Sequence, residues 1–274
     1  MIPSIQWWCS ARGIGWTWNW QPFPGVWLFV AAVGVIALRH ARRGRAGWCA
    51  AAVALLWLTL EWPVGPLGAG YLASVHAFQF MMLAMVLPPL FLLVSGGRAT
   101  APARASRSPL GRLGRRVRHP LLAMVVFGAV ILITHAPRVV DPLMRSQLGS
   151  FALDLGWFAS GLAFWWWLVP EDGGPSRLPS GLRVPYLFLG TLAHLYIGMW
   201  LLLAPLPVYA TYELAPRVFA LSALEDQQVA GAGILLLGAG EVLGVITYLF
   251  FRWAREEEQR DVTAPAGARA APSA

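Results

Sequence analysis

The sequence predicts an all-α polytopic membrane protein with seven transmembrane helices. Three observations predict this fold class: 57% of the 274 residues are hydrophobic, only 12% are charged, and apolar runs alternate with arginine-containing connections. A soluble domain normally carries about 25% charged residues, and a helix needs about 20 apolar residues to cross the hydrocarbon core of a bilayer. The predicted spans are residues 24–38, 46–61, 71–95, 120–136, 149–168, 184–206 and 227–251.

The first element is a tryptophan-rich segment over residues 1–23. Tryptophan prefers the head-group layer of a bilayer, so this segment is predicted to lie at the membrane interface. It has no basic stretch before an apolar core, which indicates that it is not a cleavable signal peptide. Cys9 in this segment and Cys49 in the second span have no metal-binding spacing, and we predict no disulfide between them.

The seven predicted spans form a single transmembrane domain over residues 24–253. Pro88 and Pro89 fall inside the third span and should kink it, because neither residue donates a backbone hydrogen bond. The connection at 96–119 is rich in Gly, Ala, Pro, Ser and Arg and is predicted to be a flexible cytoplasmic loop. The tail at 254–274 has a similar composition and is predicted to be disordered.

The distribution of arginine predicts the orientation of the chain. All 21 basic residues are arginines, and the assigned spans place 17 of them on one side of the membrane and 4 on the other. The positive-inside rule then puts the N-terminus outside and the C-terminus in the cytoplasm. The net charge of +8 is explained by topology and contacts with membrane lipids, so we expect no nucleic-acid partner.

Polar residues from five predicted spans fall in one layer on the outer side of the membrane. Polar side chains are costly in hydrocarbon, so they are candidates for a functional site. Imidazoles with carboxylates and amides nearby suit a transition metal or haem. The residues are His76 and His135 as predicted metal ligands, with Gln79, Asp154, Asp226, Gln227 and Glu61 as supporting polar groups. A hydrogen-bonded cluster that fixes the helices together, or a proton or solute path, remains open.

Some polar and sulfur-containing residues lie outside this layer or face away from it. His194 and Glu241 lie deeper in the sixth and seventh spans, and a buried hydrogen-bonded pair is the favoured interpretation. Met81, Met82 and Met85 face away from His76 around the helix, which favours packing or lipid contact over copper binding. Asp226 is also expected to cap the free N–H groups at the start of the last span.

Five motifs occur in order along the spans and carry a resemblance. They are His76-Ala77-Phe78-Gln79 with Pro88-Pro89, Thr134-His135-Ala136-Pro137 with Asp141, Gly161-Leu162-Ala163-Phe164-Trp165-Trp166, Pro207-Val208-Tyr209 with Tyr212, and Leu224-Glu225-Asp226-Gln227-Gln228-Val229-Ala230-Gly231. Together they resemble the membrane-embedded CtaG family of cytochrome c oxidase assembly proteins. The similarity covers residues 24–253.

The resemblance implies a role in assembling a haem-copper respiratory oxidase in a bacterial plasma membrane. It implies copper as the cargo, supplied from the outer side, and the oxidase catalytic subunit as the partner. It also implies histidines at three positions that here are Phe80, Phe151 and Leu155. His76 and His135 are the imidazoles that remain as copper ligands.

Other functions stay open at this point. The chain could be a metal-free structural or interaction subunit of a respiratory membrane complex, or a haem protein with His76 and His135 as axial ligands. A transporter is less favoured, since the sequence has no paired halves with matching interrupted helices. It contains no nucleophile elbow, Gly-rich phosphate loop or HExxH motif, so we predict that the protein is not an enzyme.

Overall fold

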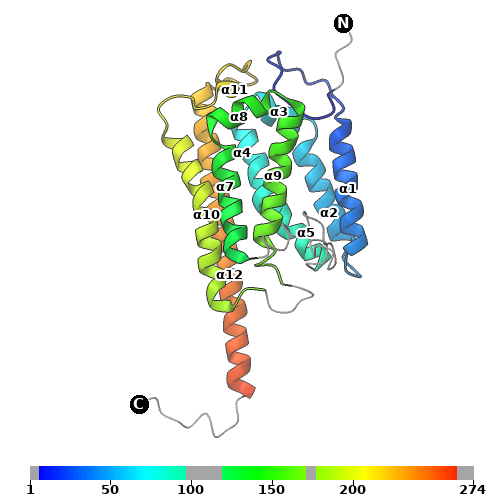
Figure 1. Cartoon of the computed structure of the whole chain (residues 1–274), viewed down its shortest axis with the longest axis vertical. Helices are drawn as coiled ribbons and strands as arrows, with labels where there is room; N and C mark the ends of the chain where they lie inside the picture. Colours follow the sequence, from blue (N-terminus) through cyan, green and yellow to red (C-terminus); the bar gives the residue numbers. More distant parts are fainter. Residues whose placement is uncertain (1–5, 97–118, 171–176, 264–274) are drawn as a thin grey trace.

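In the part of the chain that the computed structural model describes, residues 6–96, 119–170 and 177–263, every regular element is a helix. The long helices run side by side in one bundle (Figure 1). They are α1 (Pro24–His40), α2 (Ala46–Leu60), α4 (Ala73–Met81), α5 (Leu87–Ser95), α7 (Pro120–Thr134), α9 (Gln147–Trp165), α10 (Ser180–Leu203) and α12 (Ala223–Thr263). This is the predicted all-α class.

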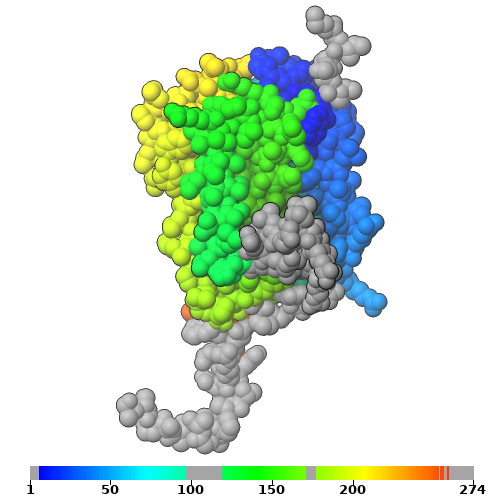
Figure 2. All heavy atoms as spheres, in the orientation of Figure 1, coloured from blue at the N-terminus to red at the C-terminus, as the bar shows by residue number. Residues whose placement is uncertain are grey.

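Three short helices lie together at one end of the bundle, which we call the short-helix end (Figure 1). They are α3 (Val64–Gly70), α8 (Pro137–Met144) and α11 (Ala210–Glu213). The N-terminal segment lies at the same end, and α12 extends beyond the bundle at the opposite end. In the space-filling view, α7 and α9 form the front of the bundle, between α1 on the right and α10 on the left (Figure 2).

Every predicted span contains a helix, but the helices differ in their capacity to cross a membrane. Three stretches among the described residues are long and apolar enough to cross alone, and these are Ala73–Ser95, Ser180–Leu203 and Ala223–Arg252. Two bent pairs raise the number to five: α2 with α3 at 42° and α7 with α8 at 73°. Helix α1 is apolar but has only 17 residues. Length and composition therefore support three to five spans.

A turn of π-helix, η1 (Met82–Val86), joins α4 to α5. Pro88 lies two residues after its end and has no N–H to donate to the carbonyl of Ala84, four residues earlier. A wider helical turn is one way to accommodate such a missing bond. A Cβ atom on Gly161 of α9 would lie 2.5 Å from the Ala84 oxygen. Helix α9 therefore approaches this irregular turn at a residue without a side chain.

The N-terminal segment packs against the bundle more closely than a segment that only lies at the membrane interface. Trp8 is buried, and the backbone N–H of Trp7 donates to the Gln147 side chain of α9 at 2.7 Å. Trp18 and Trp20 are exposed, as an interfacial position requires. Residues 6–23 thus cover part of the short-helix end. Cys9 is a buried free thiol within this segment, and burial raises its pKa.

At the other terminus, the prediction of a disordered tail from residue 254 was wrong for residues 254–263. Helix α12 continues without a break to Thr263. The run from Ala254 to Arg260 consists of Ala, Arg, Glu and Gln, which are strong helix formers, and neither Gly nor Pro interrupts it. Residues 264–274 lie outside the described residues, as do residues 97–118, which make up most of the predicted flexible loop at 96–119.

Candidate functional site

His76 comes from the second turn of α4, inside the bundle at the short-helix end. It is 5% exposed, and its Nε2 atom has no hydrogen-bond partner among the described residues. Buried polar atoms in proteins are nearly always hydrogen-bonded, so an unpartnered nitrogen points to a ligand or a functional constraint.

His135 directly follows α7, where the chain turns into α8. It is 2% exposed, and its Nδ1 lies 2.8 Å from the carbonyl oxygen of Ile131. A carbonyl can only accept, so Nδ1 carries the proton and Nε2 keeps its lone pair. That Nε2 also has no partner among the described residues.

The structure brings the two predicted ligands together. The ring centroids of His76 and His135 are 6.3 Å apart, although the residues come from different helices. Trp157 of α9 contacts both rings, with centroids 5.1 Å from His76 and 5.6 Å from His135. Phe80, one turn after His76, lies 4.6 Å from His135. The histidine pair therefore lies in an aromatic enclosure.

Two tyrosines close this enclosure on the side of the short helices. The Tyr209 hydroxyl donates to the His135 backbone oxygen at 3.0 Å. The Tyr212 hydroxyl donates to the Gly68 oxygen of α3 at 2.7 Å, and its ring lies 5.7 Å from His76. Burial raises the pKa of both phenols, which keeps them protonated donors.

Gln79 and Glu61 connect α4 and α1 to the second helix. The Gln79 amide donates to the Thr59 oxygen at 2.9 Å. One Glu61 oxygen accepts from the Trp27 indole of α1 at 2.8 Å, and the other is buried without a partner among the described residues. Neither side chain is hydrogen-bonded to the histidine pair.

Asp154 of α9 fixes the N-terminal segment. Its Oδ2 accepts the indole N–H of Trp8 at 2.8 Å, across 146 positions of sequence. Trp8 is itself buried, with its ring 4.9 Å from that of Phe151. This carboxylate therefore stabilises the covering of the short-helix end.

Asp226 was expected to cap its own helix, and that expectation was wrong. Its carboxylate accepts the N–H of Ala73 at 2.6 Å, the N–H of Ser74 at 3.3 Å and the Ser74 hydroxyl, so it caps α4. Helix α12 begins instead with a reciprocal pair, in which Ser222 and Glu225 each accept the other's backbone N–H.

Gln227, the next residue of α12, links the two ends of the α10–α12 connection. Its Oε1 accepts from the Val208 N–H at 2.6 Å, and its Nε2 donates to the Leu201 oxygen at 3.2 Å. All five supporting residues therefore bind protein groups, and the two histidines keep free nitrogens. Among the described residues, no group of three or more His, Cys, Asp or Glu is arranged to hold a metal.

The three positions that the resemblance assigns to histidine have different surroundings. Phe80 contacts His135. Phe151 contacts Trp8 at a centroid distance of 4.9 Å. Leu155 is 39% exposed on the side of α9. Only the first of these positions adjoins the histidine pair.

His194 of α10 and Glu241 of α12 are not hydrogen-bonded to each other. Both ring nitrogens of His194 and one Glu241 oxygen are buried without a partner among the described residues. The imidazole packs on Gly238, where an added Cβ would lie 2.8 Å from Nε2. Met81, Met82 and Met85 are all buried, which agrees with packing rather than lipid contact.

Sequence reasoning missed the parts of the site that hold it together. Trp157 donates its indole N–H to the Thr134 hydroxyl at 2.9 Å, which fixes the ring against both histidines. Asp141 accepts the N–H groups of Ala210 and Thr211 at 3.2 and 3.0 Å, which caps α11. The signal for Asp141 was its place after the His135 motif. For Trp157, the only indication in the sequence was its place one helical turn after Asp154.

Comparisons with known proteins agree with the resemblance. Residues 27–256 match the family model of the cytochrome c oxidase caa3 assembly factor. Uncharacterised proteins of Mycobacterium bovis and Mycobacterium tuberculosis are each 29% identical over 271 residues, covering 85% of this chain and 40% of the relative. A protein of Mycobacterium leprae is 25% identical over 268 residues, with 88% and 40% covered. The chain thus spans about two fifths of these relatives' length. No solved structure matches it.

Proposed function

Because the chain belongs to the cytochrome c oxidase caa3 assembly factor family, we propose that it assists assembly of a haem-copper oxidase by holding copper at His76 and His135. Copper is the cargo, and the oxidase catalytic subunit is the partner that receives it. The observation that carries this proposal is the pair of buried imidazoles whose Nε2 atoms have no partner among the described residues. An assembly role involves no catalysis by the chain itself.

The chemistry of the donor set fits copper. Imidazole nitrogen is a good copper ligand, and it binds first-row metals at about 2 Å. Ring centroids 6.3 Å apart are compatible with one ion between the two nitrogens. The bond from His135 Nδ1 to Ile131 is the type of outer contact that orients a ligating imidazole. A site with two ligands binds less tightly than a richer one, which suits a carrier that must release its cargo.

The proposal includes the placement of the protein in a bacterial plasma membrane. A helix in each of the seven predicted ranges supports seven spans. The arginine distribution supports an N-terminus outside and a C-terminus in the cytoplasm. The mycobacterial relatives support a bacterial source of the family. In this orientation the histidine pair lies near the outer surface, where copper would arrive.

A metal-free scaffold is the second candidate. The observation that favours it is that Gln79, Asp154 and Asp226 each bind groups of the protein rather than face the histidines. A bis-histidine haem is a weaker third candidate. Trp157 and Phe80 pack against the imidazoles at centroid distances of 5.1 and 4.6 Å, in space that a macrocycle between the rings would need.

Copper stoichiometry of the detergent-purified full chain, reduced and loaded with Cu(I), tests the proposal. We expect about one copper per chain, lost in His76→Ala and in His135→Ala. The matched control is His40→Ala, which removes an exposed imidazole at the end of α1. Equal copper in all variants would overturn the assignment. No copper together with normal folding would favour the scaffold, and a Soret band in the absorption spectrum would favour haem.

A cellular arm tests the assembly role. Membranes from cells that carry His76→Ala or His135→Ala should contain the variant protein but show low oxidase activity and low copper in the oxidase. Added copper that restores activity would link the defect to metal supply. Full oxidase activity with both variants would separate the assembly role from this site.

A further inference from the structure

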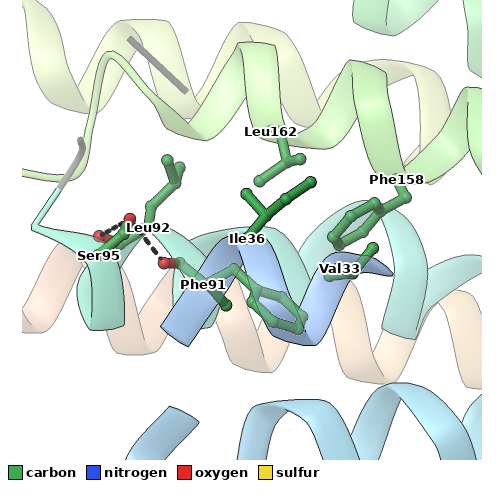
Figure 3. A pocket seen from close by; sticks show the side chains of 8 residues that line it. Val33, Ile36, Phe91, Leu92, Ser95, Phe158 and Leu162 are labelled. Carbon is green, nitrogen blue, oxygen red and sulfur yellow. Dashed lines mark hydrogen bonds between the residues drawn. The ribbon is translucent and has the colours of Figure 1, made fainter. Parts of the chain in front are cut away.

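Two apolar grooves flank α5 at the end of the bundle opposite to the short helices. The first lies between α1, α5 and α9, with a volume of about 210 Å³, and Ile36, Phe91 and Phe158 are among its walls (Figure 3). The second lies between α2 and α5, with a volume of about 590 Å³, and includes Trp48 and Leu55. The second volume is in the range of sites that hold small molecules.

The walls of these grooves offer almost no unused polar group. The Ser95 hydroxyl lines the first groove but donates to the backbone oxygens of Phe91 and Leu92, at 2.9 and 3.3 Å (Figure 3). The second groove is lined by aliphatic residues of α2 and α5 apart from its mouth. A hydrocarbon chain suits such walls, because nothing polar in them would be left without a partner.

The mouth of the second groove is cationic. Arg45 lines it, and its guanidinium donates to the Leu93 oxygen at the end of α5. The N–H of Arg42 donates to the Val94 oxygen at 3.3 Å, so the α1–α2 turn is fixed on the end of α5. Arg43 lies exposed in the same turn. An arginine fork in this position can bind phosphate with its remaining donors.

No acidic residue occurs in the sequence of the elements that build this mouth. Residues 24–60 and 82–96 contain neither Asp nor Glu. Trp48 follows Arg45 by one helical turn and is 70% exposed beside the groove. Tryptophan next to arginine is typical of the head-group level of a bilayer, with hydrocarbon on one side and phosphate on the other.

We propose that an anionic phospholipid binds specifically at this place. An acyl chain lies in the groove between α2 and α5, the phosphate binds Arg43 and Arg45, and Trp48 packs at the level of the head group. The inference does not depend on copper binding or on the orientation of the chain. The end of α5 would then bind one specific phospholipid, in addition to the general contact that any membrane helix makes with lipid.

The test uses the full chain in nanodiscs with equal amounts of phosphatidylglycerol and phosphatidylcholine, followed by native mass spectrometry of the lipids that remain bound. We expect phosphatidylglycerol to be enriched. An arginine near an anionic lipid surface contributes about 1 kcal/mol, so Arg43→Gln should lower the enrichment about fivefold. Arg138→Gln is the matched control, because Arg138 is exposed in α8 at the opposite end.

A second variant tests the acyl chain independently of charge. Ala51 lines the groove, so Ala51→Phe should fill it and lower lipid retention without changing the arginines. Equal retention of both lipids, or no effect of Arg43→Gln and Ala51→Phe, would overturn the proposal. So would displacement of the lipid by inorganic phosphate with no effect of Ala51→Phe, which would leave an anion site alone.

Discussion

Phe80 and His135 lie edge to face with their ring centroids 4.6 Å apart, so one of the three positions that the resemblance assigns to histidine adjoins the imidazole pair. Phe80 comes from α4, one turn after His76, and also contacts Trp157 at 5.4 Å. A phenyl ring here keeps the enclosure filled but contributes no lone pair.

Phe80→His should therefore strengthen copper binding, because it places a third imidazole beside the other two. Loss of an outer partner of a ligand alone alters metal affinity by about 10–100-fold. A third direct ligand should act at least as strongly, so we expect a gain of at least about tenfold. Competition with a Cu(I) chelator measures it. The control is Phe151→His, which places an imidazole against Trp8 and should leave the affinity unchanged. An equal gain in both variants would contradict the geometry of the site.

Asp226→Ala should destabilise the bundle without removing the proposed copper ligands, His76 and His135. The carboxylate accepts from Ala73 and Ser74 at the start of α4, and loss of such a cap costs about 1–2 kcal/mol. Thermal unfolding in detergent should show a lower midpoint, with copper stoichiometry kept in the folded fraction. Glu225→Ala, at the exposed neighbouring position, should have a smaller effect. A larger loss for Glu225→Ala would refute the capping role of Asp226.

Gly68→Ala should disturb the link between α4 and α2. The new Cβ would lie 1.8 Å from Gln79 Oε1, so the amide must leave its bond to Thr59. Overpacking of this kind costs about 1–3 kcal/mol. Gly47→Ala is the control, since no atom lies within 4 Å of its added Cβ. Because both changes act on one contact, Gly68→Ala with Gln79→Ala should cost less than the sum of the single effects.

Trp8→Phe should loosen the N-terminal covering. It keeps most of the buried ring but leaves the Asp154 oxygen without its donor, at a cost of about 1–3 kcal/mol. Limited proteolysis of residues 6–23 and the unfolding midpoint both measure it. Asp154→Leu added to Trp8→Phe should recover part of the stability, because neither polar partner then remains. No recovery would mean that the indole acts through packing alone.

Cysteine labelling tests the orientation. The native Cys9 and Cys49 are buried, so background labelling should be low. A membrane-impermeant maleimide should label Trp18→Cys in intact cells, and Arg255→Cys only after permeabilisation, since both positions are exposed on opposite sides of the bundle. Labelling of both from one side would require an even number of spans.

That His76 and His135 share one layer could be predicted from sequence, because depth in a membrane follows from span boundaries; that their rings lie 6.3 Å apart could not. Both residues fall near the same end of antiparallel spans, and such positions can meet. The partners of Asp154 and Asp226 could not be predicted in this way. Trp8 and Ala73 lie 146 and 153 positions away from them, and only the packing of the bundle brings these groups together.

The helix content was predictable for a different reason. Apolar runs bounded by Pro24, Pro120 and the arginine turns define where helices begin and end. The short helices α3, α8 and α11 were missed. Helices α3 and α8 have only 7 and 8 residues, far below the length of a span. The start of α11 depends on a tertiary cap, Asp141, rather than on periodicity. Counting the membrane spans also could not predict that these short helices lie over the histidine pair.

Helix α12 has a mechanical consequence. Its 41 residues correspond to about 60 Å at 1.5 Å per residue, twice the roughly 30 Å of the hydrocarbon core. The candidate span within it stops at Arg252, so the turns through Thr263 form a stiff spacer about 16 Å long. A protein domain fused after this spacer would be held away from the lipid surface. The direction that it faces would be set by the rotation of the last helical turn.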